Sequence, residues 1–151
     1  MIARELMTPQ PACCTPDETV GEAARLMKEH DCGCIPVVED KETDRLVGVV
    51  TDRDIACRCT AEGKGPDTPV AEAMSRDPKC CSPDDDVDRV ERIMAEAQVR
   101  RVPVVDQRGC CIGIIAQADL ALHQRAGSES EIGHMVERIS EPAHSAGSSR
   151  R

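Results

Sequence analysis

Apolar residues recur along this chain with two spacings, and the same succession of spacings occurs twice. A helical spacing of i, i+3, i+4 and i+7 is followed by two short apolar runs and then by a second helical segment. In the first copy these segments are residues 20–27, 35–38, 46–50 and 51–59. In the second copy they are residues 87–94, 102–105, 111–115 and 116–124. With a short extended piece at 12–15 and 79–82, the pattern predicts strand, helix, strand, strand, helix, twice over. This is an α+β fold.

Direct comparison of the two halves shows that they are copies of one unit. A shift of 67 aligns residues 7–38 with residues 74–105, and 13 of these 32 positions are identical. Further along, a shift of 65 aligns Gly48 and Asp54 with Gly113 and Asp119. A unit of about 55 residues is too small to bury its own apolar faces well, so we expect the two copies to pack on each other.

Local signals give the boundaries of these elements. Thr19 and Asp86 are typical helix N-caps. A proline inside each first apolar run indicates a strand at a sheet edge, or the start of a strand. We predict repeat 1 over residues 1–60, a Gly/Pro-rich linker over 61–69, repeat 2 over 70–124 and a tail over 125–151. Within the tail, a capping-box pattern at Ser128 and Glu131 precedes an apolar stripe, which predicts a short amphipathic helix at 129–140. Its stripe would bury on the body or on a second subunit.

Composition narrows the classes of partner. Hydrophobic residues make up 40% of the chain, but there is no Phe, Tyr or Trp, so the core must be aliphatic. The net charge of −9 and the lack of aromatic side chains argue against nucleic acid, whose binding uses cationic contacts and stacking platforms. No apolar run approaches the ~20 residues of a membrane span, and the first residues lack the apolar core of a signal peptide. We expect a cytoplasmic protein with no membrane and no nucleic-acid partner.

The polar turn after the second apolar run is the main candidate for chemistry. In the first copy, Thr51 and Asp54 begin a helix. A hydroxyl and free N–H groups there suit a phosphate, and a carboxylate suits the two hydroxyls of a ribose. The same spacing also describes an N-cap with an acid three residues on. In the second copy Ala116 replaces the cap residue while Asp119 remains, which weakens the cap interpretation for Asp119. An acid in the first turn still favours the helix dipole, so both interpretations stay open.

Phosphate charge requires cations, and an arginine can fork onto a phosphate with two hydrogen bonds. The candidates are Arg53, Arg100 and Arg101, with Arg58 and Lys64 behind them. Arg100 and Arg101 directly precede a strand, where neighbouring side chains point to opposite faces, so we expect at most one of them to enter a cleft. The first copy has Gly33 and Cys34 at these positions, which makes the two halves unequal.

At this point the residues resemble a known family. Each copy has the motif hydrophobic-Pro-Val-Val. A second motif follows, in which a glycine, two hydrophobic residues and usually a Ser or Thr lead to an aspartate six residues after the glycine. Two such copies resemble a CBS-domain pair (Bateman module). The second copy departs from the pattern where Ala116 stands in place of Ser or Thr. The resemblance covers residues 1–124, and its motifs are loose singly but specific when doubled and in register. Residues 51–55, 61–63 and 99–104 further resemble the small stand-alone bacterial CBS-pair proteins.

This resemblance implies a ligand cleft between the two repeats. Family members commonly bind AMP, ADP or ATP there, and sometimes NAD or S-adenosylmethionine. The resemblance also implies a homodimer formed through the CBS helices and a regulatory, non-catalytic role that needs no cofactor. The protein partner that would receive the signal is not identified by the sequence.

Within that cleft we expect the better nucleotide site at Thr51, Arg53 and Asp54, with Arg100 or Arg101 reaching its phosphates. The base would rest against Ile35 and Pro36, and against the strand near Thr15. In the second site the corresponding residues are Val102, Pro103 and Asp119.

Ten cysteines, which fall in neighbouring pairs, support a competing hypothesis. A cysteine often acts as a small buried hydrophobe, and Cys32-x-Cys34 and Cys57-x-Cys59 fit the spacing of a zinc site only loosely. The alternative is a stress, redox or zinc-responsive CBS protein that has no nucleotide ligand and acts through protein–protein interaction. The chain has no nucleophile elbow, glycine-rich phosphate loop or close His–carboxylate motif, so we do not expect an enzyme.

Overall fold

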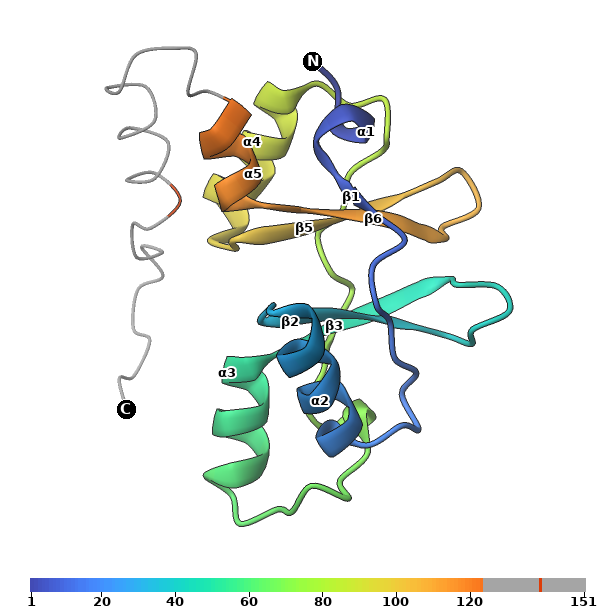
Figure 1. Ribbon diagram of the computed structural model, residues 1–151, viewed down its shortest axis with the longest axis vertical. Helices are drawn as coiled ribbons and strands as arrows, with labels where there is room; N and C mark the ends of the chain where they lie inside the picture. Colours follow the sequence, from blue (N-terminus) through green and yellow to red (C-terminus); the bar gives the residue numbers. More distant parts are fainter. Residues whose placement is uncertain (124–138, 140–151) are drawn as a thin grey trace.

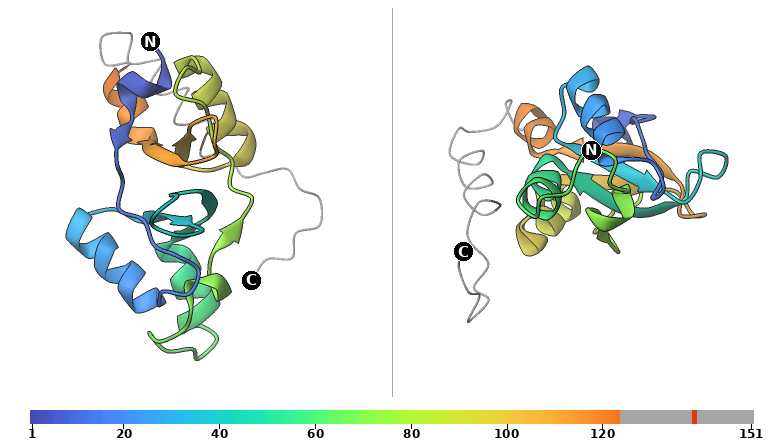
Figure 2. Two further views of the ribbon diagram at one scale, coloured as in Figure 1. Left: turned by 90° about the vertical axis from the view of Figure 1, so that its right-hand side faces the viewer. Right: turned by 90° about the horizontal axis from the view of Figure 1, so that it is seen from below.

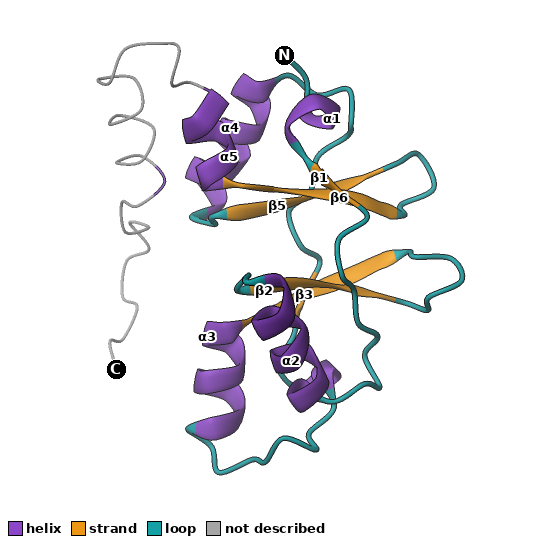
Figure 3. Cartoon of the chain, viewed as in Figure 1, coloured by secondary structure: helices purple, strands orange, loops and turns teal. Residues whose placement is uncertain are grey.

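Two three-stranded sheets lie face to face in the middle of the molecule, and helices cover the outer face of each (Figures 1 and 3). The computed structural model describes residues 1–123 and residue 139. One sheet has the order β2-β3-β4, formed by β2 (Cys34–Val38), β3 (Leu46–Thr51) and β4 (Ser75–Arg76). The other has the order β1-β6-β5, formed by β1 (Thr8–Pro9), β6 (Cys111–Ala116) and β5 (Arg101–Val105).

The helices follow the predicted order. The first sheet is covered by α2 (Val20–His30) and α3 (Asp52–Ile55), the latter continued by the π-helical turn η1 (Ala56–Thr60). The second sheet is covered by α4 (Val87–Ala97), α5 (Gln117–His123) and the short α1 (Ala3–Leu6), and a 3-10 turn η2 (Val70–Glu72) precedes β4. Both predicted N-caps are confirmed. The Thr19 hydroxyl accepts a hydrogen bond from Glu22 N at 3.1 Å, and the Asp86 carboxylate accepts one from Asp88 N at 3.2 Å.

Each sheet takes its third strand from the segment that leads into the other repeat. We call residues 1–9 and 68–76 the lead-in segments. The first contributes β1, which pairs antiparallel with β6, and the second contributes β4, which pairs antiparallel with β3 (Figure 2). Their backbones make matching hydrogen bonds at positions 67 residues apart: Ala3 N to Asp85 O at 2.8 Å, and Val70 N to Glu18 O at 2.7 Å. The two repeats therefore exchange their lead-in segments.

The exchange also mixes the two aliphatic cores. The core beneath the first sheet includes Val70, Ala73 and Met74 from the second lead-in segment. The core beneath the second sheet includes Ala3 from the first, with Leu6 and Met7 packed against it. The predicted tail helix at 129–140 lies outside the described residues, except that Ile139 is buried in this second core.

The β2-β3 and β5-β6 hairpins are also hydrogen-bonded to each other near their turns. Leu46 N donates to Gly109 O at 2.9 Å, and Cys111 N donates to Asp44 O at 2.8 Å. The two sheets are thus linked at both the lead-in segments and the hairpin turns.

The strands predicted at 12–15 and 79–82 are wrong in extent. Each is reduced to a single parallel bridge, between Cys14 and Val37 and between Cys81 and Val104. Prolines on either side of each cysteine pair have no N–H to donate, which limits the pairing to one residue. The edge position that the internal prolines indicated is confirmed, because β2 and β5 both lie at the edge of their sheets.

A glycine lies where each lead-in strand pairs with a strand of the other repeat, Gly48 in β3 and Gly113 in β6. A Cβ on Gly48 would lie 2.6 Å from the backbone oxygen of Ser75, in β4. A Cβ on Gly113 would collide with the Met7 side chain, next to β1. The glycine repeated in the two copies is therefore explained by the close approach of the exchanged segments.

We predict that Gly48→Ala lowers the free energy of unfolding by about 1–3 kcal/mol, as is typical of overpacking, because a backbone oxygen cannot move as a flexible side chain can. Chemical denaturation measured by circular dichroism checks this. Gly65→Ala is the matched control: a Cβ added at Gly65 would have no neighbouring heavy atom within 4 Å, so its stability should stay within about 0.5 kcal/mol of the parent. An equal response of the two variants would contradict the close approach as the cause.

Candidate functional site

The first polar corner is a complete helix cap. Thr51 ends β3, and its hydroxyl accepts a hydrogen bond from Asp54 N at 3.0 Å. In return, Asp54 Oδ2 accepts from Thr51 N at 2.9 Å. The other carboxylate oxygen lies 4.0 Å from Arg58 Nε, and the Asp54 side chain is 17% exposed. The cap interpretation of this corner is therefore confirmed, and one oxygen of Asp54 remains outside the cap.

The second corner keeps half of the same cap. Asp119 Oδ2 accepts a hydrogen bond from Ala116 N at 2.8 Å. The inference that losing the cap side chain weakens the cap interpretation of Asp119 was wrong, because this half of the box uses a backbone N–H, which alanine retains. At both corners, one carboxylate oxygen is engaged by the backbone.

Each corner borders a cavity. The Thr51 cavity, of about 810 Å³, is lined by Thr51, Arg53, Arg100 and Arg101 among others. The Asp119 cavity, of about 350 Å³, is lined by Asp119, Ala116, Ile35 and Arg101 among others. Both volumes lie in the range of small-molecule sites. The structure thus brings together four of the predicted residues at the first corner, while Asp54 itself does not line the cavity.

The cations are placed differently from the strand-based expectation. Arg100 and Arg101 both line the Thr51 cavity, so the expectation that at most one of them enters is wrong. The reason is that β5 begins only at Arg101, and Arg100 belongs to the turn before it, where strand alternation does not apply. Among the described residues, no ion pair involves Arg53, Arg100 or Arg101.

Arg58 and Lys64, the two further candidates for phosphate binding, have structural roles. Arg58 Nη1 donates to the carbonyl oxygens of Ala73 and Met74, both at 3.0 Å, and so holds the second lead-in segment. Lys64 pairs with Glu72 at 2.9 Å. Neither lines the Thr51 cavity.

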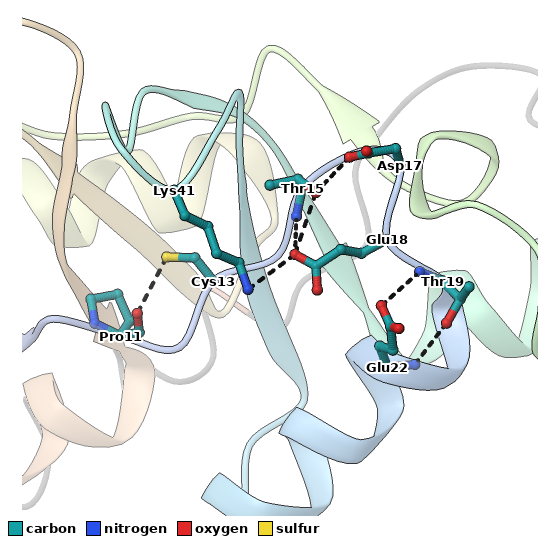
Figure 4. Close-up of polar contacts among 8 residues, drawn as sticks. All are labelled: Pro11, Cys13, Thr15, Asp17, Glu18, Thr19, Glu22 and Lys41. Carbon is teal, nitrogen blue, oxygen red and sulfur yellow. Dashed lines mark hydrogen bonds and ion pairs between the residues drawn. The ribbon is translucent and has the colours of Figure 1, made fainter.

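The residues expected around the base do not gather at one cavity. Ile35 lines the Asp119 cavity instead of the Thr51 cavity, and Pro36, Val102 and Pro103 are buried in their strands and line neither. The Thr15 hydroxyl contacts Asp17 Oδ1 at 2.6 Å, and its backbone N–H donates to Glu18 Oε1 at 3.0 Å (Figure 4). Thr15 is therefore part of a local turn and lines neither cavity.

Sequence reasoning missed the residues at the ends of the first helix of each repeat. Asp31 and Gln98 are the C-caps of α2 and α4, with positive φ of 50° and 55°, and both line the Thr51 cavity. The repeat alignment itself could have identified them. They occupy matching positions, two residues before Gly33 and Arg100.

The thiols differ in pKa, chiefly because they differ in burial and in their neighbours. Desolvation raises the pKa of Cys14, Cys34 and Cys81 to about 12 in each case. The Cys13 thiol of the first repeat donates to Pro11 O at 3.2 Å (Figure 4), and the Cys111 thiol of β6 donates to Gly113 O at 3.5 Å. Interaction with the Cys111 thiol lowers the pKa of Cys13. Within residues 1–123 and 139, no three His, Cys, Asp or Glu side chains are grouped as metal ligands.

Comparison with known proteins decides the family. The model of the CBS domain matches residues 3–58 and 70–125. The chain belongs to the CBS-domain family. In sequence, this CBS pair is 42% identical over 127 residues to the CBS domain-containing protein YhcV of Bacillus subtilis, covering 84% of this chain and 88% of that one. It is 38% identical over 122 residues to hypoxic response protein 1 of Mycobacterium tuberculosis, covering 80% and 83%.

Solved structures agree with this CBS-pair fold. Hypoxic response protein I with two coordinated zinc ions superposes with a TM-score of 0.74 at 35% identity, covering 82% of this chain and 98% of that one. CBSX2 in complex with AMP gives a TM-score of 0.70 at 28% identity, covering 81% and 94%. The CBS pair of MJ0100 with 5-methylthioadenosine and S-adenosyl-L-methionine gives 0.76 at 25% identity, covering 85% and 98%. In the part of this chain that the structure describes, no helix combines the length and apolarity needed to cross a membrane.

The Cys13–Cys111 contact predicts a pH-dependent difference in thiol reactivity. Interaction with the Cys111 thiol lowers the pKa of Cys13, whereas burial raises the pKa of Cys80. Because the thiolate is the reactive species, Cys13 should reach half of its maximal alkylation rate at lower pH than Cys80. Iodoacetamide labelling across pH, read by peptide mass spectrometry, measures both.

A matched pair of variants tests whether the Cys111 thiol is the cause of the lowered Cys13 pKa. Cys111→Ala removes the donor and should move the Cys13 profile to higher pH, whereas Cys111→Ser keeps a donor and should move it less. A Cys13 profile that is unchanged in Cys111→Ala would contradict this assignment.

Proposed function

We propose that this CBS pair is a non-catalytic regulatory module that binds an adenine nucleotide of the AMP, ADP or ATP class. The preferred site is the Thr51 cavity. The observation that carries the proposal is the convergence of Arg53, Arg100 and Arg101 on one cavity that also contains the hydroxyl of a helix cap. Three arginines outnumber the two carboxylates on this cavity, Asp31 and Asp52, and so form a local site for a small anion in a chain with a net charge of −9.

The residues of the two corners suit the remaining parts of the ligand. In this proposal, the carboxylate oxygens of Asp54 and Asp119 that remain outside the caps accept from ribose hydroxyls. Asp119 already lines its cavity, whereas Asp54, whose outer oxygen lies 4.0 Å from Arg58 Nε, has to turn towards the Thr51 cavity. Aliphatic side chains such as Ile35 and Val49, which line the cavities, contact the base in place of aromatic rings. The related structures of CBSX2 with AMP and MJ0100 with two adenosine derivatives support an adenosine-type ligand. NAD and S-adenosylmethionine fit less well, because three arginines favour a ligand with a terminal phosphate, and neither of these molecules has one.

The wider part of the proposal concerns signalling. The module would form a homodimer through its helices and report ligand binding to a protein partner in the cytoplasm, without a required cofactor.

A second function is favoured by one specific observation, the thiol contact between Cys13 and Cys111 across the two repeats. The related structure of hypoxic response protein I with two coordinated zinc ions supports metal binding in a similar fold. In that case the chain responds to redox state or zinc through protein–protein interaction and binds no nucleotide.

Calorimetric titration with AMP, ADP and ATP tests the nucleotide proposal. We expect binding to the parent protein and a loss of affinity of about tenfold or more in Asp54→Asn, because a hydrogen bond to a charged group is removed. Asparagine keeps an oxygen for the Thr51 N–H, so the cap persists. Asp67→Asn, in the exposed linker, is the control and should bind like the parent. The absence of any adenine-nucleotide binding, or equal affinity in Asp54→Asn, would contradict the proposal.

A further inference from the structure

The two cavities share a wall, and that wall contains one arginine. Asp31, Cys32, Cys34 and Arg101 line both the Thr51 cavity and the Asp119 cavity. The Thr51 cavity has Arg53 and Arg100 in addition. On the described lining of the Asp119 cavity, Arg101 is the only arginine or lysine. Two candidate anion sites therefore depend on the same guanidinium to different degrees.

The shared arginine results from an asymmetry between the repeats. The shift of 67 places Cys34 at the position that matches Arg101, so a symmetrical pair would have one cation for each cavity. Instead, burial raises the pKa of Cys34 to about 12, and its thiol is neutral at physiological pH. Asp31, which matches the uncharged Gln98, adds a negative charge to the shared wall. Arg101 is thus the one arginine on both described linings, beside the Asp31 carboxylate, while His30 lines the Asp119 cavity alone.

We propose that Arg101 couples the two cavities, so that a phosphate bound in one lowers the affinity of the other for a second phosphate-bearing ligand. Two phosphates drawn to one guanidinium would divide its five N–H donors and its single positive charge, and they would repel each other. A nucleoside without phosphate does not compete for Arg101. The inference rests on the proposed nucleotide function and specifies how its two sites are regulated.

The unequal cations set the order of filling. The Thr51 cavity keeps Arg53 and Arg100 in every state, so it takes the first nucleotide. Once that phosphate has engaged Arg101, the described lining of the Asp119 cavity retains the carboxylates of Asp119 and Asp31, with His30 as its one remaining basic side chain. It is then selective for an uncharged adenosine-type ligand over a nucleotide.

Titration with AMP and with adenosine, which differ only in the phosphate, tests this coupling. In the parent protein, adenosine should fill two sites with affinities within a few-fold of each other. AMP should fill one site, with the second at least tenfold weaker than AMP binding to the Asp119 cavity alone. The latter affinity is measured in Asp54→Asn, where the first site is impaired.

Arg101→Gln and Arg100→Gln form the matched pair. In Arg101→Gln, the second AMP should bind as it does to the double variant Arg101→Gln/Asp54→Asn, which means that the coupling is gone. Arg100 lines only the Thr51 cavity, so Arg100→Gln should weaken the first AMP and leave the tenfold coupling in place. Retained adenosine binding shows that each variant is folded.

The outcomes separate the coupling from the proposed function. Two equivalent AMP sites in the parent, or coupling that persists in Arg101→Gln, would overturn the coupling and leave nucleotide binding intact. A loss of adenosine binding in Arg101→Gln would also overturn it, because Arg101 would then be structural. The absence of binding by both AMP and adenosine in the parent would overturn the proposed function together with this inference.

Discussion

The exchange of lead-in segments is the constraint on which the rest of this structure depends. Neither hairpin forms a three-stranded sheet by itself, and neither core is closed without side chains from the other repeat's lead-in segment. The same backbone hydrogen bonds recur at matching positions in both halves, and the hairpin turns are joined at the far end. The two corners at Thr51 and Asp119 consequently border two cavities with a shared wall, in a frame held by backbone pairing at the lead-in segments and at the hairpin turns.

Within this symmetrical frame, chemistry is distributed unequally. The backbone treats the corners alike, because each aspartate accepts from the N–H of the helix cap residue. The side chains differ: arginines gather on one side, and a glycine and a neutral thiol stand at the matching positions. Gly33 also accommodates the Asp52 carboxylate, which a Cβ there would approach to 2.9 Å. Duplication has thus kept the fold and allowed the two sites to diverge.

The sequence predicted what is local or repeated. Helix spacing, the caps at Thr19 and Asp86 and the edge strands with an internal proline all depend on near neighbours, and the structure confirms them. It did not predict the exchange, because a strand of two residues such as Thr8–Pro9 leaves no periodicity, and its partner lies more than 100 residues away. The placement of Arg100 was wrong for a related reason. One residue decides where a strand begins, and strand ends are the least certain feature of such a pattern.

The exchange also sets an order in time for the folding chain. Thr8 and Pro9 leave the ribosome long before their partners in β6, residues 113 and 114. The second core, which includes Ala3, therefore cannot close until nearly all of the described chain has been synthesised. Long-range pairing of this kind slows folding and leaves apolar side chains exposed in the meantime. For this protein the two repeats are units of sequence, but the whole pair is the unit that folds.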